Sequence, residues 1–303
     1  MSELCLPKCL NGNIDLKWAV ENGGINAGLL YYRYIDGAVG NPGELPKHLR
    51  RVIDQAGFYT STLYKDRMIG TCCALARQGC SVAITEGTLS SRLAIGLGIA
   101  SQFENGICLH RIHGFPYIPG STLKGVTHEY ALQFDYGCAP EDEKKRKKAE
   151  QDHIFVAVFG AQSRRDANDE ENGALSSHRG SVIFFDAVPA VDSNLLEIDV
   201  MTPHYGDYYT ESKGEWPADY LGPNPISFLT VPRGTRFLLS LAACDYENRG
   251  TKMPAREVLN KALEWLNGAL DKLGVGGKTS VGYGHFDQFE DLTPSPSGEV
   301  DAL

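Results

Sequence analysis

The sequence has no apolar run of about twenty residues, the length that a membrane-spanning helix needs. Its first residues also lack the charged and apolar regions of a secretory signal peptide. Eight cysteines occur, but none forms a Cys-x-x-Cys pair and no zinc-finger spacing is present. We therefore expect a cytoplasmic protein with reduced thiols, no metal, no cofactor and no membrane contact.

Positive charge is also scarce, because 29 Lys and Arg stand against 38 Asp and Glu, a formal net charge of −9. A protein that coats nucleic acid non-specifically needs cations for its phosphate contacts. The charge balance argues against that class of protein. It leaves room for a local basic groove, since net charge bears mainly on solubility and association.

Glycine is plentiful, above all in residues 274–284, where five of eleven positions are Gly. Glycines allow close backbone approach, and a run of exposed N–H groups can form an anion-binding concavity. The stretch is not a nucleotide-binding P-loop, because Lys272 stands where that motif needs its first glycine. The predicted order is also helix, loop, strand, the reverse of a P-loop. A loop of this kind suits a phosphodiester backbone.

The pattern from residue 81 onward predicts an α+β core. Strand-like segments and helical periodicities alternate as strand, helix, strand, strand, helix, strand, which is the ferredoxin-like β-α-β-β-α-β order. Ser121 is the expected N-cap of the first helix, and residues 226–231 and 235–243 are expected to pair as a hairpin. The predicted elements are strands 82–85 and 92–98, helix 121–134, strand 181–187, strands 226–231 and 235–243, helix 255–273 and strand 281–289.

The domain organisation follows from composition. We expect an N-terminal extension, residues 1–80, that packs on a core of residues 81–290. Large insertions are expected at about 137–178 and 190–225, and the first carries a charge run that is either a solvated insertion or a helix continuation. The Pro- and Ser-rich tail, 291–303, is expected to be disordered.

Several motifs occur in an order that resembles the RAMP superfamily of CRISPR-associated proteins. They are residues 117–125, 158–161, 180–187 and the glycine-rich loop. Residues 92–98, 109–114 and 199–205 are similar to the sixth Cmr subunit of type III-B effector complexes, and the resemblance covers about residues 82–290.

The resemblance implies a ferredoxin-like (RRM-like) fold and a non-catalytic, crRNA-binding backbone subunit of an antiviral effector complex. Such a subunit lies near the 3′ end of the guide, where it caps a filament of related subunits. Its expected partners are guide RNA, target RNA, other Cmr RAMP subunits and a small helical subunit.

Two segments are the main RNA-binding candidates. Gly120, Ser121 and Lys124 open a helix, where free N–H groups, hydroxyls and a cation suit a phosphate. The other reading is a capped helix with a surface lysine. The second segment supplies Gly276, Gly277, Lys278, Thr279 and Ser280, unless the loop is only a tight turn. Contacts of both kinds position a strand without reading its sequence.

Further candidates are less specific. Arg92 and Arg111 could bind phosphates or form ordinary ion pairs. The loop residues His204, Tyr205, Tyr208 and Tyr209 could stack on bases or dock a neighbouring subunit. His110 and His113 have a metal-like spacing but no third ligand nearby, so we expect no metal site.

Two enzymatic alternatives stay open. A metal-independent endoribonuclease that processes CRISPR precursor RNA would use His110, His113 or His128 as base and Lys124 to stabilise charge. A target-slicing enzyme would use Asp199 or Asp207 with a divalent metal. Cleavage without metal by the isolated protein would support the first, and loss of activity with a chelator would identify the second.

Overall fold

The structure is a computed structural model that describes residues 25–33, 44–56, 62–103, 105–161, 178–190, 194–203, 225–248 and 250–293. The chain divides into two compact units. Unit 1 comprises residues 1–59, 96–116 and 192–232, and unit 2 comprises residues 60–95, 117–191 and 233–303. The predicted boundary at residue 80 falls inside unit 2, between its first helix and its first strand.

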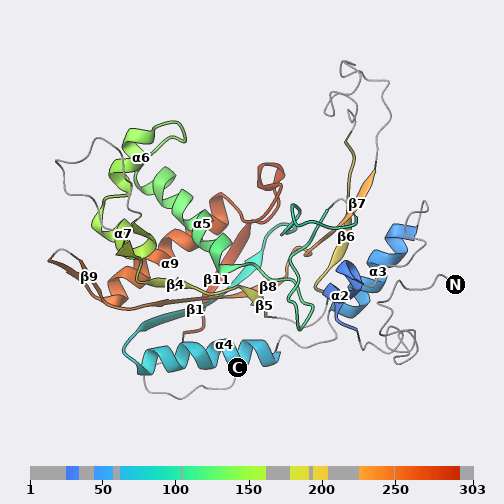
Figure 1. Cartoon of the computed structure of the whole chain (residues 1–303), viewed down its shortest axis with the longest axis horizontal. Helices are drawn as coiled ribbons and strands as arrows, with labels where there is room; N and C mark the ends of the chain where they lie inside the picture. The colour runs from blue at the N-terminus through green and yellow to red at the C-terminus, as the bar shows by residue number, and fades with distance from the viewer. Residues whose placement is uncertain are drawn as a thin grey trace. The chain divides into compact units, whose positions relative to one another are not determined.

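Unit 2 is built on a five-stranded antiparallel sheet (Figure 1). Its main path runs β11-β1-β8-β4, and β5 pairs with β8 beside that path. The long β1–β8 ladder pairs Ser81 with Ala243 and continues to Thr88 with Arg236. The strands are β1 Ser81–Leu89, β4 Val182–Phe184, β5 Val188–Pro189, β8 Arg236–Ala243 and β11 Phe286–Asp291.

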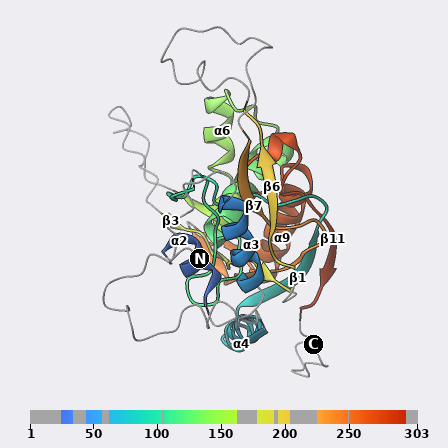
Figure 2. The same ribbon diagram turned by 90° about the vertical axis from the view of Figure 1, so that its right-hand side faces the viewer.

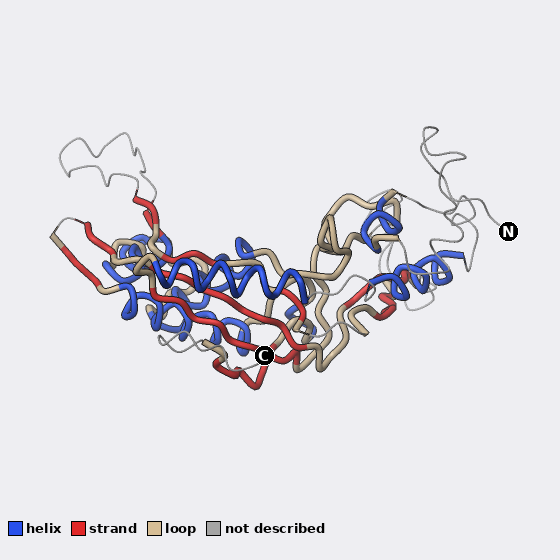
Figure 3. The backbone as a smooth tube through the Cα atoms, turned by 90° about the horizontal axis from the view of Figure 1, so that it is seen from below, coloured by secondary structure: helices blue, strands red, loops and turns tan. Residues whose placement is uncertain are grey.

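Helices cover both faces of this sheet. Helices α5 Gly120–Tyr130 and α9 Ala255–Lys272 pack against each other on one face, and α4 Thr62–Arg77 lies along the other (Figure 3). The 3.6-residue repeat predicted α9 correctly: its apolar face is buried, and Trp265 Nε1 donates to Asp135 Oδ2 at 2.9 Å. The mixed helix-and-sheet class is therefore confirmed. Seven buried residues of β8 explain why this strand lies inside the sheet.

Smaller elements complete unit 2. A π-helical turn extends α5, and two short helices follow it, of which α6 contains the predicted charge run. The elements are η2 Ala131–Asp135, α6 Glu143–Ala149, α7 His153–Phe159, β2 Gly160–Ala161, β3 His178–Arg179, β9 Tyr246–Asn248, β10 Thr251–Met253 and the 3₁₀ turn η3 Thr279–Val281.

Unit 1 contains α2 Ala27–Tyr32, α3 Glu44–Ala56 and the two-stranded ribbon of β6 Glu197–Met201 with β7 Ile226–Thr230 (Figure 2). Helix α3 packs on both strands of the ribbon. The Asn26 side chain caps α2 by accepting from Leu29 N at 3.1 Å, and its Nδ2 donates to the carbonyl of Arg111 at 3.3 Å. These bonds fasten α2 to the loop of residues 96–116.

The predicted 226–231/235–243 hairpin is wrong. Strand β7 pairs with β6, whereas β8 pairs with β1, β4 and β5. The Pro-Arg-Gly turn forms, with Gly234 at φ 84°, but both edges of β8 are already occupied by other strands. The turn therefore joins two sheets and marks the boundary between the units.

Three local predictions also need correction. Residues 92–98 form a loop with an isolated bridge from Ala94 to Gly277, because Gly96 takes φ 83° and breaks the extended run. The predicted strand 181–187 ends at Phe184, since the chain turns Asp186 toward α5 before β5 begins. Pro119, not Ser121, is the N-cap of α5, and this proline makes no side-chain capping bond.

Across the described part of the chain, no helix is both long enough and apolar enough to span a bilayer.

Candidate nucleic-acid interface

The glycine loop of residues 274–284 closes on itself directly after α9. Val275 N donates to the carbonyl of Gly284 at 2.9 Å, and both ends of the loop have positive φ, 70° at Gly274 and 75° at Gly284. A Cβ on Gly284 would overlap the carbonyl oxygen of Val275. Glycine is thus required there by both conformation and space.

The loop packs against the segment that follows β1. Gly277 N donates to the carbonyl of Ala94, and Gly284 N to the carbonyl of Arg92, both at 2.7 Å. A Cβ on Gly276 would also press on the Ala94 carbonyl. The pairing holds the loop in one position and places the exposed Arg92 next to it.

The tip of the loop presents a cation in a strained conformation. Lys278 lies in the left-handed region, φ 61° and ψ 27°, and directly precedes the 3₁₀ turn η3. Ser280 and Gly282 are exposed, and Val281 is 68% exposed. A non-glycine residue in this region costs of order 1 kcal/mol, and such strain often marks a functional position. We call Arg92, Gly276, Gly277, Lys278, Thr279 and Ser280 the glycine-loop surface.

The N-terminus of α5 is satisfied by the protein itself. Gly120 N donates to Asp186 Oδ1 at 2.7 Å, so a carboxylate already faces the positive end of the helix dipole. Lys124 Nζ donates to the carbonyl of Phe159 at 2.9 Å. Burial, followed by the nearby charge of Arg179, lowers the pKa of Lys124. Ser121 keeps an exposed position.

Both candidate segments lie at one end of the sheet of unit 2. Strand β1 ends there and α9 leads into the glycine loop there, while α5 begins beside Phe184 and Phe185, where β4 ends (Figure 1). The structure thus gathers Arg92, Gly276, Gly277, Lys278, Thr279 and Ser280 on one surface. The same end also contains Gly120, Ser121 and Lys124. There the Gly120 N–H group and the Lys124 ammonium already have hydrogen-bond partners within the protein.

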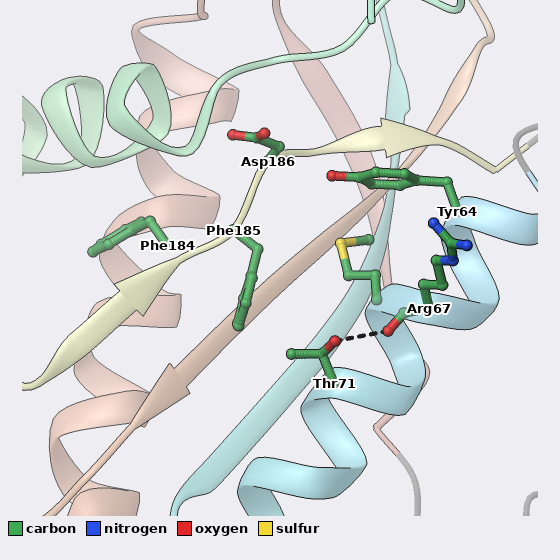
Figure 4. A pocket seen from close by; sticks show the side chains of 7 residues that line it. Tyr64, Arg67, Thr71, Phe184, Phe185 and Asp186 are labelled. Carbon is green, nitrogen blue, oxygen red and sulfur yellow. Dashed lines mark hydrogen bonds between the residues drawn. The ribbon is translucent and has the colours of Figure 1, made fainter. Parts of the chain in front are cut away.

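A cavity of about 330 Å³ adjoins this end of the sheet, between α4 and the end of β4 (Figure 4). Tyr64 and Arg67 line it from α4, with Phe185 and Asp186 opposite. Burial, and then the charge of Asp186, raise the pKa of Tyr64. Aromatic walls beside one cation and one carboxylate suit a planar polar ligand better than a purely apolar one.

The remaining predicted residues lie elsewhere. Arg111 is exposed in unit 1, within a turn whose N–H groups at Ile112 and His113 donate to His110 Nδ1. His110 also stacks on Phe115 at 4.9 Å between ring centroids. Residues 111–113 form a turn.

Among the enzymatic candidates, Lys124 and His128 both lie on α5 in unit 2, whereas His110, His113 and Asp199 belong to unit 1. His128 packs edge-on against Phe155 and Phe159, and burial lowers its pKa. Asp199 Oδ1 accepts from the next backbone N–H, that of Val200, at 2.8 Å. Where the structure describes the chain, no group of three or more His, Cys, Asp or Glu is arranged to hold a metal ion. Asp207 and the predicted stacking residues His204, Tyr205, Tyr208 and Tyr209 lie outside the described residues.

Sequence reasoning missed Asp186. It follows a run of buried aromatic and branched residues, and nothing nearby marks it as a cap for a helix more than sixty positions earlier. The signal that could have found it is its place at the end of a predicted strand, beside a helix that lacks a side-chain cap of its own.

Comparisons with known proteins agree with this architecture. Residues 88–287 match the family model described as the RAMP superfamily. A relative from Pyrococcus furiosus, named CRISPR system Cmr subunit Cmr6, is 35% identical over 233 residues, which cover 66% of this chain and 66% of the relative. The CRISPR system CMR subunit Cmr6 from Saccharolobus solfataricus is 27% identical over 206 residues, covering 67% of this chain and 56% of that one.

A solved structure shares the fold. A chain in the cryo-EM structure of the type III-B Cmr-beta bound to cognate target RNA superposes with a TM-score of 0.56 at 22% identity. The match covers 82% of this chain and 75% of that chain. At this identity the likeness concerns the arrangement of helices and strands.

Proposed function

Since the chain belongs to the RAMP superfamily, we propose that it is a guide-RNA-binding subunit of a type III-B CRISPR effector complex. Both curated relatives carry the name of a Cmr subunit, and together they support this assignment over other RAMP roles. The subunit would act in the cytoplasm, as a non-catalytic part of the backbone that holds the guide near its 3′ end.

The ferredoxin-like core is part of the proposal. Six elements occur in the order β1, α5, β4, β8, α9, β11, and the strand order β11-β1-β8-β4 places the first and third of the four strands, β1 and β8, side by side. Both crossover helices lie on one face. This pattern supports the β-α-β-β-α-β assignment, with residues 81–290 as the RAMP domain.

The observation that carries the function is the glycine-loop surface. Its bonds to Ala94 and Arg92 fix the loop, while Lys278 and Ser280 stand at its tip. A preorganised loop with a cation and hydroxyls suits the phosphodiester backbone, which is the same for every guide. A subunit that must accept guides of any sequence needs contacts of this kind.

An acidic chain can serve this role if it binds RNA mainly within an assembly. With a net charge of −9 we expect weak binding by the isolated chain and strong retention in the complex. The partners in our proposal are guide RNA, target RNA, other Cmr RAMP subunits and the small helical subunit. The insertions 137–178 and 190–225 and the extension 1–80 would supply contacts to these neighbours, with residues 204–209 either stacking on bases or docking.

Purification of the tagged protein from its host, with sequencing of the RNA and identification of the proteins that accompany it, tests the proposal. We expect repeat-derived small RNAs together with several Cmr subunits. A protein that comes without RNA and without Cmr partners would contradict the proposal.

The site assignment has its own test. The double variant Lys124→Ala with Lys278→Ala should weaken guide retention in the assembled complex, because two cations near the guide backbone are lost. Retention equal to that of the unmodified complex would rule out this site while leaving membership of the complex intact.

A further inference from the structure

Two cysteines lie side by side at the other end of the sheet, where α4 leads into β1. Cys80 Sγ is 2.8 Å from Cys244 Sγ, although the two residues are 164 positions apart in sequence. Cys80 is half-buried and Cys244 is exposed. The proposed RNA-binding function makes no use of either thiol.

The strand register makes this approach a consequence of the fold. Ser81 pairs with Ala243, so Cys80 and Cys244 are the next opposed positions of the β1–β8 ladder. Cys244 N donates to the carbonyl of Ser181 on the β4 side, and Cys80 N donates to the carbonyl of Leu75 at the end of α4. Neither cysteine therefore donates its backbone N–H to the other, and the two residues form a non-hydrogen-bonded pair.

In a non-hydrogen-bonded antiparallel pair the Cα atoms are about 4.5 Å apart and the side chains approach most closely. That separation lies within the range of about 4.4–6.8 Å that disulfides span. A covalent bond between the two sulfurs thus needs no rearrangement of the backbone.

Accessibility separates this pair from most other thiols that the structure describes. Cys72, Cys108 and Cys138 are buried, and an oxidant must reach a sulfur before it can react. Cys73, on α4, is half-buried and provides a matched control of similar exposure to Cys80.

We propose that Cys80 and Cys244 form a redox modification site, which closes to a disulfide when the protein meets a peroxide. The exposed Cys244 sulfur attacks the peroxide, so the O–O bond breaks, an S–O bond forms and the first water leaves. The Cys80 sulfur then displaces the hydroxyl group of the resulting sulfenic acid, which departs as a second water with the Cys80 proton. Two thiols are oxidised by two electrons and one peroxide is reduced.

The electrostatics of the pair agree with this order of events. The hydrogen bond to Cys244, followed by burial, raises the pKa of Cys80 to about 11. The raised pKa disfavours the thiolate of Cys80, which is the form that reacts with a peroxide. Its role is to resolve the sulfenic acid formed on its neighbour.

The disulfide would close a chain loop that contains β1, α5, β4 and β8. Restricting the unfolded chain in this way raises the thermal stability of the folded state. The bond lies at the end of the sheet opposite the glycine-loop surface, so guide retention should not change on oxidation.

The test treats the full chain with hydrogen peroxide and maps peptides without reduction. We expect a peptide pair joined through Cys80 and Cys244, a melting temperature several degrees higher, and reversal of both by dithiothreitol. Cys73→Ser should keep the linked pair, and Cys80→Ser should lose it together with the rise in melting temperature. If Cys80→Ser does not fold, peptide mapping of the unmodified chain carries the test.

Two results would overturn the proposal. One is oxidation of Cys244 to sulfenic or sulfinic acid while Cys80 remains a free thiol that an alkylating reagent modifies. The other is a linked pair that contains a different cysteine. Neither result bears on guide binding, and the absence of guide RNA from the purified complex would leave this redox site untouched.

Discussion

The glycine loop and the N-terminus of α5 have similar compositions, with glycines, hydroxyls and one lysine, but the structure uses them differently. At α5, Gly120 N and Lys124 Nζ have partners within the protein, the Asp186 carboxylate and the Phe159 carbonyl. In the glycine loop, backbone bonds to residues 92–94 fix the loop, while Lys278 and Ser280 stand at its tip. Composition shows that a segment can bind an anion, and the tertiary contacts show that a carboxylate and a carbonyl already face the polar groups at the start of α5.

The largest expected effect concerns the loop's rigidity. Gly284→Ala should destabilise the fold by about 3 kcal/mol or more, because alanine must adopt positive φ and its Cβ overlaps the Val275 carbonyl. Gly282→Ala is the matched control, since Gly282 has φ 92° but open space around its Cβ position. It should cost only about 1 kcal/mol. Urea unfolding of both variants measures the difference, and equal costs would show that the loop is not held in place.

The next effect concerns the cap on α5. Asp186→Ala removes a charge-assisted hydrogen bond to Gly120 N and should cost about 1.5 kcal/mol. The same change removes a negative charge from this end of the sheet, so guide retention should rise or stay equal. Denaturation and RNA retention in the assembled complex measure the two effects. A loss of retention in a folded variant would mean that Asp186 itself helps to hold the guide.

A smaller effect is expected at the last turn of α5, where Glu129 binds Arg146 through two bonds of 3.0 and 2.7 Å. The hydrogen bond from Arg146 is the main reason that the pKa of Glu129 falls to about 2 from an ordinary value of 4.5. Because the pKa of Glu129 is lower in the folded protein than in the unfolded chain, its ionised carboxylate stabilises the fold above pH 4.5. This contribution is lost as the pH falls toward 2.

Arg146→Ala should therefore lower the melting temperature slightly at pH 6, and the difference from the unmodified protein should shrink as the pH approaches 2. Lys147→Ala, an exposed neighbour on α6, should show no such pH dependence. Melting curves from pH 6 to pH 2 provide the measurement. A difference that stays constant with pH would mean that the pair does not set the Glu129 pKa.

Much of unit 2 follows from local sequence signals. The 3.6-residue repeat in 255–273 predicts α9, and the mixed helix-and-sheet class follows from alternating patterns. Pairing between distant strands does not follow from local signals. The sequence predicts the turn at Gly234, but its local pattern does not show that β1 and β4 flank β8. For the same reason the glycine loop could be predicted as a candidate, whereas the Asp186 cap and the Cys80–Cys244 pair depend on contacts between distant segments.

The most direct measurement of the central claim compares Lys278→Gly with Lys252→Ala in the assembled complex. Glycine relieves the left-handed strain at position 278 while removing the cation, and Lys252 is an exposed lysine paired with Glu247 on the β9–β10 ribbon. We predict that Lys278→Gly folds at least as stably as the unmodified protein but loses guide RNA. The affinity of the complex for the guide should also fall less steeply with salt concentration, by about the contribution of one phosphate contact. Lys252→Ala should retain the guide. Equal retention by the two variants would contradict the assignment of the glycine-loop surface to the guide backbone.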